Sequence, residues 1–387
     1  MWNNLKNPQE RPSRSSLVKR IVVFAVVVVA VCSAVGLILF QDSVNFDALR
    51  RWVKYFNIRD EGEQDIYAFD SHNSNRYGAA GSGLAVASVG GLTYYQDNGV
   101  ERFSIQQQLE LPQLLTAGKM MLAYDVGGTA LLAADTGGER LSLTADQAIL
   151  DADLSSGGSL CYSSGSSGYK SVLTVYNAQQ ELVYRWLSST TYMPQCAISE
   201  KGNLLAAVGL GASGGAFEST LHLFRTDAEG VQWTASLGNE LIYDLFFLDS
   251  GAICALGETS AQIYKTDGTP VARYTYSEPY LKEYDLGGDG FLALAVNMYR
   301  AGNRNSLVTV SETGEEIASV YLGREILDLS ACGGYVAVLT PDQLTIYNKS
   351  LEVYAETSDI GTATSVLMRS DGSALLLGGG AGWLYLP

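Results

Sequence analysis

The sequence repeats a glycine-centred turn at intervals of about 40 residues, from residue 80 to the C-terminus. In each repeat this inner turn lies between two apolar runs, which is typical of two buried strands joined by a tight connection. A second turn follows inside a hairpin of alternating apolar and polar residues. The inner turns fall at Gly83, Gly118, Gly158, Gly202, Gly251, Gly290, Gly334 and Gly372, and the hairpin turns near Gly99, Gly138, Gln179, Gly230, Gly268, Gly314 and Ser350.

Each unit therefore predicts four short strands, and residues 241–276 show the pattern most completely. Four strands per unit of about 40 residues is the signature of a β-propeller, whose blades are too small to bury their faces alone and stack around an axis. The 41 Gly against 8 Pro suit many tight turns. We predict an all-β fold, a propeller of about eight four-stranded blades, with seven as the alternative.

The two turn series differ by one, because the chain ends on the third strand of its last unit. An open edge there would invite pairing with another chain. Residues 65–70, DIYAFD, form a strand-like segment ahead of the first unit. We predict that this segment supplies the missing outer strand and closes the ring. Seven blades stay open as the alternative, because the first unit, around residues 72–83, has the weakest pattern.

The N-terminal region predicts a membrane anchor. Residues 21–40 carry no charge and are long enough to cross a hydrocarbon core as a helix. The alternatives are a cleaved signal peptide or a lipoprotein using Cys32, and both fit the length and flanks of this run less well. We predict a cytoplasmic tail (1–20), a transmembrane helix (21–40), a juxtamembrane segment (41–64) and an extracytoplasmic propeller (65–387).

The predicted orientation follows the positive-inside rule by a narrow margin. Five basic residues precede the span, whereas the four that follow it are interspersed with acidic residues. Residues 45–58 place apolar side chains at helical spacing, which predicts an amphipathic helix. This helix would lie on the membrane surface, pack on the propeller, extend the spanning helix or meet a partner helix. Its apolar stripe is Phe46, Leu49, Trp52, Val53 and Phe56.

The charge balance excludes one class of partner. The formal net charge is −16, and all but one of the 41 acidic residues follow residue 40. A domain this acidic lacks the clustered cations that bind nucleic acid. Four cysteines lie in apolar strand-like runs without the spacing of a metal or redox site, which predicts buried free thiols, although a disulfide such as Cys161 with Cys196 stays open. The other two are Cys254 and Cys332.

One set of polar residues recurs at a fixed place in the repeat. Residues seven positions before an inner turn should form a ring near the axis, and four acidic groups there would hold a cation, bind a cationic or polyhydroxylated ligand, or line a hydrated channel. Tyrosines on the same segments predict an aromatic mouth. The candidate ring is Asp151, Gln195, Asp244, Glu283 and, one position off, Asp328; the candidate mouth is Tyr192, Tyr280 and Tyr284.

The hairpin turns, of which residues 263–268 (IYKTDG) are an example, resemble those of the quinoprotein-like and tryptophan-aspartate-like propeller superfamilies. The layout as a whole resembles an uncharacterised family of single-span propeller proteins in Gram-positive bacteria. The resemblance implies the propeller fold. The Gly-His and Trp-Asp pairs of tryptophan-aspartate repeats are absent from the sequence, as is the adjacent cysteine pair expected of a quinone-dependent dehydrogenase.

No motif in the sequence requires catalysis. Residues 211–215 match G-x-S-x-G, but they join two predicted strands, whereas a nucleophile elbow needs a strand followed by a helix. We therefore predict a non-catalytic binding, scaffold or sensor module with a protein or cell-envelope partner, no cofactor and no metal site. The alternatives are an enzyme, either a quinone-dependent oxidoreductase or a hydrolase or lyase using the acidic ring, and a carbohydrate or small-molecule receptor at the channel mouth.

Overall fold

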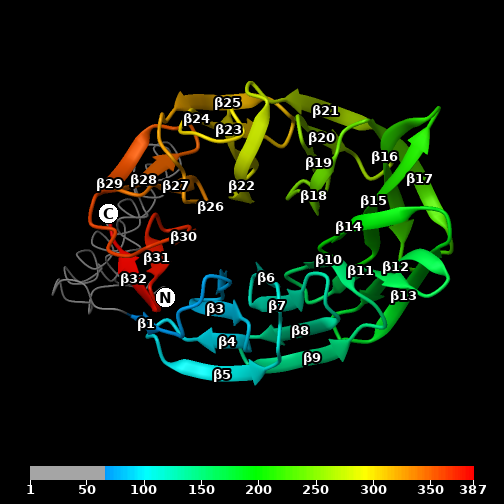
Figure 1. Cartoon of the computed structure of the whole chain (residues 1–387), viewed down its shortest axis with the longest axis horizontal. Helices are drawn as coiled ribbons and strands as arrows, with labels where there is room; N and C mark the ends of the chain where they lie inside the picture. The colour runs from blue at the N-terminus through cyan, green and yellow to red at the C-terminus, as the bar shows by residue number, and fades with distance from the viewer. Residues whose placement is uncertain (1–65) are drawn as a thin grey trace, which may run out of the picture. The chain divides into compact units, whose positions relative to one another are not determined.

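The computed structural model describes residues 66–387, and within that range every regular element is a β-strand. The strands form eight four-stranded antiparallel sheets. Figure 1 shows these sheets following one another around a common axis, each with one strand innermost. The predicted all-β propeller with eight four-stranded blades is confirmed, and the alternative of seven blades is wrong.

The first four blades follow the chain without a crossover. Blade 1 contains β2 (Arg76–Ala80), β3 (Gly83–Ser88), β4 (Gly91–Tyr95) and β5 (Glu101–Gln106). Blade 2 contains β6 (Pro112–Ala117), β7 (Met120–Asp125), β8 (Ala130–Asp135) and β9 (Gly138–Thr144). Blade 3 contains β10 (Ile149–Leu154), β11 (Leu160–Ser166), β12 (Tyr169–Tyr176) and β13 (Leu182–Ser188). Blade 4 contains β14 (Tyr192–Ile198), β15 (Leu204–Ser213), β16 (Ala216–Arg225) and β17 (Val231–Gly238).

The next three blades repeat this order, and the eighth combines both ends of the domain. Blade 5 contains β18 (Ile242–Phe247), β19 (Ile253–Gly257), β20 (Ser260–Tyr264) and β21 (Pro270–Thr275). Blade 6 contains β22 (Tyr280–Gly288), β23 (Phe291–Asn297), β24 (Asn305–Ser311) and β25 (Glu316–Tyr321). Blade 7 contains β26 (Asp328–Cys332), β27 (Tyr335–Leu339), β28 (Leu344–Asn348) and β29 (Val353–Thr357). Blade 8 contains β30 (Ser365–Met368), β31 (Ala374–Gly378), β32 (Ala381–Tyr385) and β1 (Tyr67–Ala68).

The first and last strands of the domain close the ring, as predicted from residues 65–70. β1 pairs antiparallel with β32, with Tyr67 opposite Gly382, and Figure 1 shows the two strands side by side. Tyr67 is completely buried. It packs with Leu84 of blade 1 and Leu377 of blade 8 in one apolar cluster. The closing strand therefore covers the open edge of blade 8 and contributes to the contact with blade 1.

Strand burial follows from the alternation in the sequence. The second and third strands of a blade are mostly buried on both faces and mainly apolar, as in Ile253–Gly257 of β19. The fourth strands alternate, as in β21. Six of the predicted inner-turn glycines have positive φ, but in blades 1 and 7 the turn begins one or two residues earlier, at Gly81 and Gly333. The inner turns of blades 1, 2, 6 and 7 contain two residues each, and the glycine with positive φ stands first in blades 1, 2 and 7 but second in blade 6.

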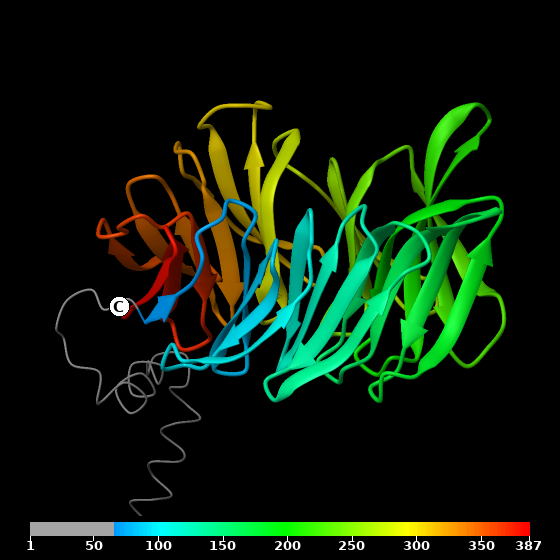
Figure 2. The ribbon, with the colours of Figure 1, turned by 60° about the horizontal axis from the view of Figure 1, so that its bottom comes forward.

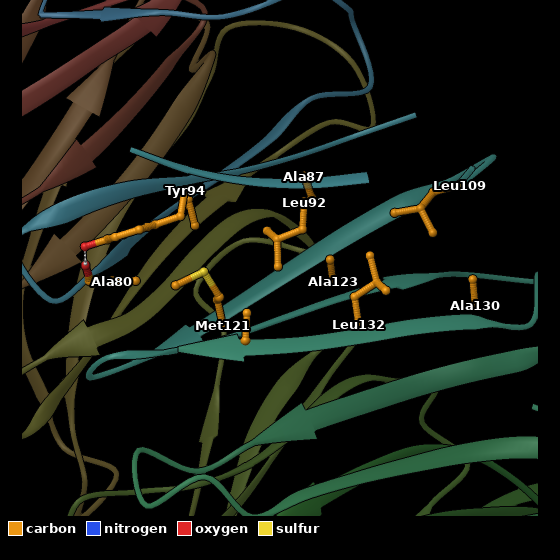
Figure 3. Packing of buried hydrophobic residues seen from close by; sticks show 11 residues of the cluster. Ala80, Ala87, Leu92, Tyr94, Leu109, Met121, Ala123, Ala130 and Leu132 are labelled. Carbon is orange, nitrogen blue, oxygen red and sulfur yellow. Dashed lines mark hydrogen bonds between the residues drawn. The ribbon is translucent and has the colours of Figure 1, made fainter. Parts of the chain in front are cut away.

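The core is divided into eight apolar clusters, one at each contact between neighbouring blades. Figure 3 shows the cluster between blades 1 and 2, where Leu92 of β4 packs near Met121 of β7. The Tyr94 hydroxyl donates a hydrogen bond of 3.0 Å to the backbone carbonyl of Ala80 within this cluster. Small residues such as Ala123 alternate with large ones, so the twisted sheets approach closely. Burial between blades, rather than within one, makes the ring the folding unit.

The strand directions give the ring two different faces. We call the face where each innermost strand begins the entry face; it also holds the turns between second and third strands. The opposite face holds the inner turns and the turns between third and fourth strands. Figure 2 shows the β15–β16 hairpin and the loop between β23 and β24 projecting on the entry face. Because β15 and β16 form one continuous hairpin, residues 211–215 lie at its tip and the G-x-S-x-G match is a β-turn.

The predicted tail, transmembrane helix and juxtamembrane helix lie outside the described residues. Among residues 66–387 there is no helix that is long and apolar enough to cross a membrane. The compact unit that contains the propeller spans Asp60–Pro387.

Candidate functional site

The predicted ring residues all lie on innermost strands. Asp151, Gln195, Asp244 and Glu283 occupy β10, β14, β18 and β22, and Asp328 begins β26. Asp328 lies one position closer to its inner-turn glycine than the other ring residues do. The turn after β26 contains two residues, between Cys332 and Tyr335, whereas the turn after β10 contains five, between Leu154 and Leu160. Repeat period and strand position together therefore locate these side chains around the axis.

Two of the carboxylates bind the backbone of the next blade. Asp151 Oδ2 accepts a hydrogen bond of 2.9 Å from the Cys196 N–H, and Asp153 Oδ2 accepts one of 2.8 Å from the Ile198 N–H. Asp151 and Asp153 lie two residues apart on β10, so their side chains share one face of the strand. They join blade 3 to blade 4, where no continuous ladder connects the two sheets.

The same arrangement recurs between blades 7 and 8. Asp328 Oδ2 accepts a hydrogen bond of 2.8 Å from the Val366 N–H, and Ser330 Oγ accepts one of 3.0 Å from the Met368 N–H. Asp328 and Ser330 are again two residues apart on an innermost strand. The repeat therefore uses this position to fix the angle between neighbouring blades.

Tyrosine hydroxyls bind two of the ring aspartates, Asp244 and Asp151. The Tyr284 hydroxyl on β22 donates to Asp244 Oδ2 at 3.1 Å, and the Tyr124 hydroxyl on β7 donates to Asp151 Oδ1 at 3.3 Å. Tyr284 therefore joins blade 6 to blade 5, and Tyr124 joins blade 2 to blade 3. Both Asp151 oxygens are thus engaged by groups of neighbouring blades.

Burial changes the protonation of these aspartates. It raises the pKa of Asp151 to about 8, against the opposing effect of the Cys196 N–H, and the charge of Asp244 adds to the rise. Burial likewise raises the pKa of Asp153 and of Asp328 to about 7, and that of Asp244 to about 6. At neutral pH the raised pKa values favour the protonated form most at Asp151 and least at Asp244, which stays mainly ionised, so the ring is less negative than its composition implies.

The geometry gives the ring a mainly cohesive role. Asp151, Asp244 and Asp328 are partly buried, whereas Glu283 is exposed. Gln195 has a buried Oε1 without a hydrogen-bond partner in the described part of the chain. Among residues 66–387 no three His, Cys, Asp or Glu side chains are arranged to hold a metal ion. The ring can accept hydrogen bonds at the axis, but most of its carboxylate oxygens already accept protein donors.

The aromatic residues of the predicted mouth separate into two levels. Tyr192 and Tyr280 are the first residues of β14 and β22 and so lie on the entry face, whereas Tyr284 lies deeper and binds Asp244. Tyr192 has an exposed fraction of 55%. The Lys170 ammonium lies 5.3 Å from the centre of its ring, an arrangement that holds the aromatic side chain at the surface.

Other exposed apolar residues continue this surface from blade 3 to blade 7. They occupy the beginnings of innermost strands or the turns between second and third strands. Exposed Val89, Leu111 and Leu150 occupy the same kinds of place on blades 1, 2 and 3. We call the following set, which contains all of the exposed aromatic residues at these places, the entry-face arc: Tyr169, Tyr192, Phe217, Leu241, Tyr243, Met298, Tyr299 and Leu327. Tyr299 has a cation–π contact of its own, with the Arg304 guanidinium 5.8 Å from the ring centre.

Sequence reasoning did not single out Asp153, Tyr124 or the arc. The two-residue spacing from Asp151 would have indicated Asp153. No local signal indicates Tyr124, because it meets Asp151 only through the packing of blade 2 on blade 3. The buried cysteines Cys161 and Cys196 are free and face each other across blades 3 and 4, with their Sγ atoms 3.6 Å apart.

The fold and site together define an eight-bladed β-propeller whose polar axis joins its blades. The chain matches the model of a family of unknown function (DUF5711) over residues 54–367, and it belongs to that family. No curated protein matches it. Among solved structures it is similar to the Dos1 propeller, with a TM-score of 0.55 and 10% identity over 83% of this chain and 94% of that one.

A further solved structure, that of U3-55K, aligns with a TM-score of 0.46 and 10% identity over 67% of this chain and 84% of that one. At 10% identity the likeness to the Dos1 propeller shows the shared fold. A fold of this kind hosts many unrelated functions, so function has to be argued from the surfaces of this chain.

Proposed function

We propose that this chain is a non-catalytic binding module and that a partner protein docks on the entry-face arc. The observation that carries the proposal is the arc itself. Exposed aromatic and aliphatic side chains gather along the entry face from blade 3 to blade 7. Contiguous exposed apolar surface is costly in water and is characteristic of interaction sites. Tyr and Met are also among the residue types enriched in protein interfaces.

The shape of the entry face favours a protein over a small ligand. The arc follows strand ends on five successive blades, and the β15–β16 hairpin with Phe217 rises beside it (Figure 2). A segment with apolar side chains lying across these strand ends would cover Tyr192 and Tyr299 together. The neighbouring Lys170 and Arg304 would then contact polar groups at the rim, as in the usual arrangement of an apolar centre and a polar border.

We do not propose the enzymatic alternative. A hydrolase or lyase using the ring would require carboxylates free to act on a substrate. Asp151 and Asp328 instead accept backbone hydrogen bonds from the next blade. Their raised pKa values follow from the same burial that allows them to join the blades.

Site-specific photo-crosslinking in membranes tests the docking surface. A photoreactive amino acid is placed at Tyr192 or Tyr299 on the arc, and at Val100 or Val353 as matched exposed positions on the opposite face. Adducts of one defined mass at the arc positions alone support the proposal. Equal adducts at all four positions, or none at the arc, contradict it. Tyr192→Ser should reduce capture of the same partner, whereas Val353→Ser should not.

We further propose that residues 21–40 anchor the propeller to a membrane with the N-terminus inside and the propeller outside. The apolar length and the flanking charges support this topology. An introduced cysteine at Ala216, exposed on the β15–β16 hairpin, reports it. A membrane-impermeant maleimide should label the Ala216→Cys variant in intact cells above the level of the unsubstituted chain. Labelling only after the cells are opened would place the propeller inside.

A further inference from the structure

A polar cavity of about 310 Å³ lies between blades 1 and 2 on the face opposite the arc. Four turns and the strands β4 and β5 form its wall, so no single blade contains it. Its volume is near the lower end of the range of ligand sites and suits a molecule the size of an amino acid or a monosaccharide. Its polar lining includes Ser82, Asp97, Arg102, Lys119 and Thr136.

Two cations at this cavity are not engaged by the protein. Arg102 and Lys119 have no ion pair or side-chain hydrogen bond among residues 66–387, although five other arginines of that range have acidic partners. Both side chains are exposed, and both line the cavity. Their position favours a negatively charged group in the space between them.

Another blade contact shows what this part of the repeat can hold. Between blades 5 and 6, the carboxylate of Glu312 on the β24–β25 turn accepts hydrogen bonds of 3.0 Å from both the Asp249 and Ser250 N–H groups. Between blades 3 and 4, the carboxylate of Glu200 accepts the Ser156 N–H at 3.2 Å. In both cases a carboxylate of one blade binds an inner turn of the preceding blade.

At the contact between blades 1 and 2 the corresponding carboxylate is missing. The first residue of the turn after the third strand is Thr136 in blade 2 and Glu312 in blade 6, although the β8–β9 turn contains two residues and the β24–β25 turn contains four. The Thr136 side chain reaches the preceding blade at Gly81, where an added Cβ would lie 3.2 Å from Thr136 Cγ2. Because Thr136 is shorter than Glu and the facing turn is Gly81–Ser82, the space stays open.

We propose that this cavity binds the carboxylate of a small organic acid. Arg102 and Lys119 neutralise the carboxylate, which takes the role that Glu312 plays between blades 5 and 6. Asp97 lies in the same wall and disfavours a second negative group, so it selects ligands that also carry hydroxyl or ammonium donors. The Thr136 and Ser82 hydroxyls complete the set of hydrogen-bonding groups. The cavity lies away from the arc, so this inference is independent of the proposed docking function.

Calorimetric titration of the full chain in detergent micelles tests the inference. The probes are D-glucuronate and L-glutamate, with D-glucose as the neutral comparison and sulfate as the anion comparison. The variants are Arg102→Gln and Lys119→Gln, which remove the cations, and Thr136→Glu, which places an internal carboxylate in the cavity. Lys265→Gln is the matched control, because Lys265 is an exposed lysine on another turn of the same face.

At least one carboxylate should bind the unsubstituted chain. We expect its affinity to fall at least about tenfold in each cation variant, the loss of one charge-assisted hydrogen bond. Thr136→Glu should abolish binding and raise the melting midpoint, which also shows that this variant folds. The inference is overturned if neither carboxylate binds, if sulfate binds equally well, or if Lys265→Gln weakens binding as much as Lys119→Gln.

Discussion

Replacement of Tyr67 by Ala tests whether the two-residue strand β1 closes the ring. Tyr67 is completely buried and forms an edge-to-face contact with Tyr95 of blade 1, with ring centres 6.2 Å apart. Few backbone hydrogen bonds hold the strand, among them Ile66 N–H to the Gly382 carbonyl at 2.8 Å and Phe69 N–H to the Gly380 carbonyl at 2.9 Å. Most of the closing energy should therefore come from the Tyr67 side chain.

The expected cost can be worked from this burial. Removal of a fully buried aromatic side chain lowers the free energy of unfolding by about 3–5 kcal/mol, because its apolar contacts are lost and a cavity remains. The opposite residue is Gly382, where an added Cβ would lie 3.2 Å from Tyr67 Cδ2, so the ring packs directly over backbone. For cooperative unfolding, the shift of the melting midpoint equals the lost free energy divided by the unfolding entropy. With about 2.1 cal/mol/K per residue over about 330 residues, a loss of about 3–5 kcal/mol lowers the midpoint by about 4–7 °C.

Differential scanning calorimetry of the full chain in detergent measures the shift. Tyr67→Phe keeps the aromatic ring of the side chain and removes only the hydroxyl, so it should change the free energy of unfolding by no more than about 1 kcal/mol. Val100→Ala, at an exposed site, should stay within about 0.5 kcal/mol. If Tyr67→Ala had the same melting midpoint as Val100→Ala, β1 would not stabilise the closed propeller, and the reasoning from burial would be refuted.

Three further predictions concern buried polar groups. Because the pKa of Asp151 is raised, this side chain keeps its proton in the folded state, whereas in the unfolded state it releases the proton above about pH 4. The contribution of Asp151 to folding stability therefore falls as the pH rises towards 8. The free energy of unfolding of the neutral Asp151→Asn variant, measured by denaturant titration relative to the parent, should therefore rise by at least about 1 kcal/mol between pH 5 and pH 8. The same difference in free energy at both pH values would contradict this. Burial lowers the pKa of His222, so the contribution of this side chain to folding stability is lost as the pH falls below about 6.5. The stability of His222→Leu relative to the parent should therefore increase as the pH falls from 7 to 5, which is the opposite pH dependence to that of Asp151→Asn. The buried Glu240 carboxylate pairs with Arg273 at 2.8 Å and accepts hydrogen bonds from the Thr259 and Ser260 N–H groups, so Glu240→Ala should cost about 3–5 kcal/mol because these buried donors lose their acceptor. Arg273→Ala should cost about 1 kcal/mol or less, because Arg273 is half exposed and the Glu240 carboxylate keeps its backbone hydrogen bonds. Equal losses in thermal unfolding would show that the ion pair, and not these hydrogen bonds, stabilises the turn.

The blade organisation could be predicted because it is encoded locally. Apolar runs, alternating hairpins and turn glycines recur within about 40 residues of each other, and each reports its own strand. Even the closing strand carried a local signal in residues 65–70, since the last unit visibly lacks a fourth strand. The turn positions at Gly83 and Gly334 were misplaced by one or two residues, because the place of the glycine within the turn varies between blades and alternation alone does not fix it.

The roles of the axis and cavity residues depend on contacts between blades. The repeat period correctly placed Asp151 on an innermost strand, but its bond to the Cys196 N–H joins residues 45 positions apart and depends on how blade 3 twists against blade 4. The cavity beside Lys119 exists because Thr136, rather than a longer side chain, faces Gly81 across two blades. The sequence by itself determined the strand pattern and predicted the closing strand, because these follow from short-range patterns, whereas the tertiary structure decided between eight and seven blades. Only the tertiary structure decided which carboxylates are bound by backbone and which cations remain unpaired, because those depend on the register between separate sheets.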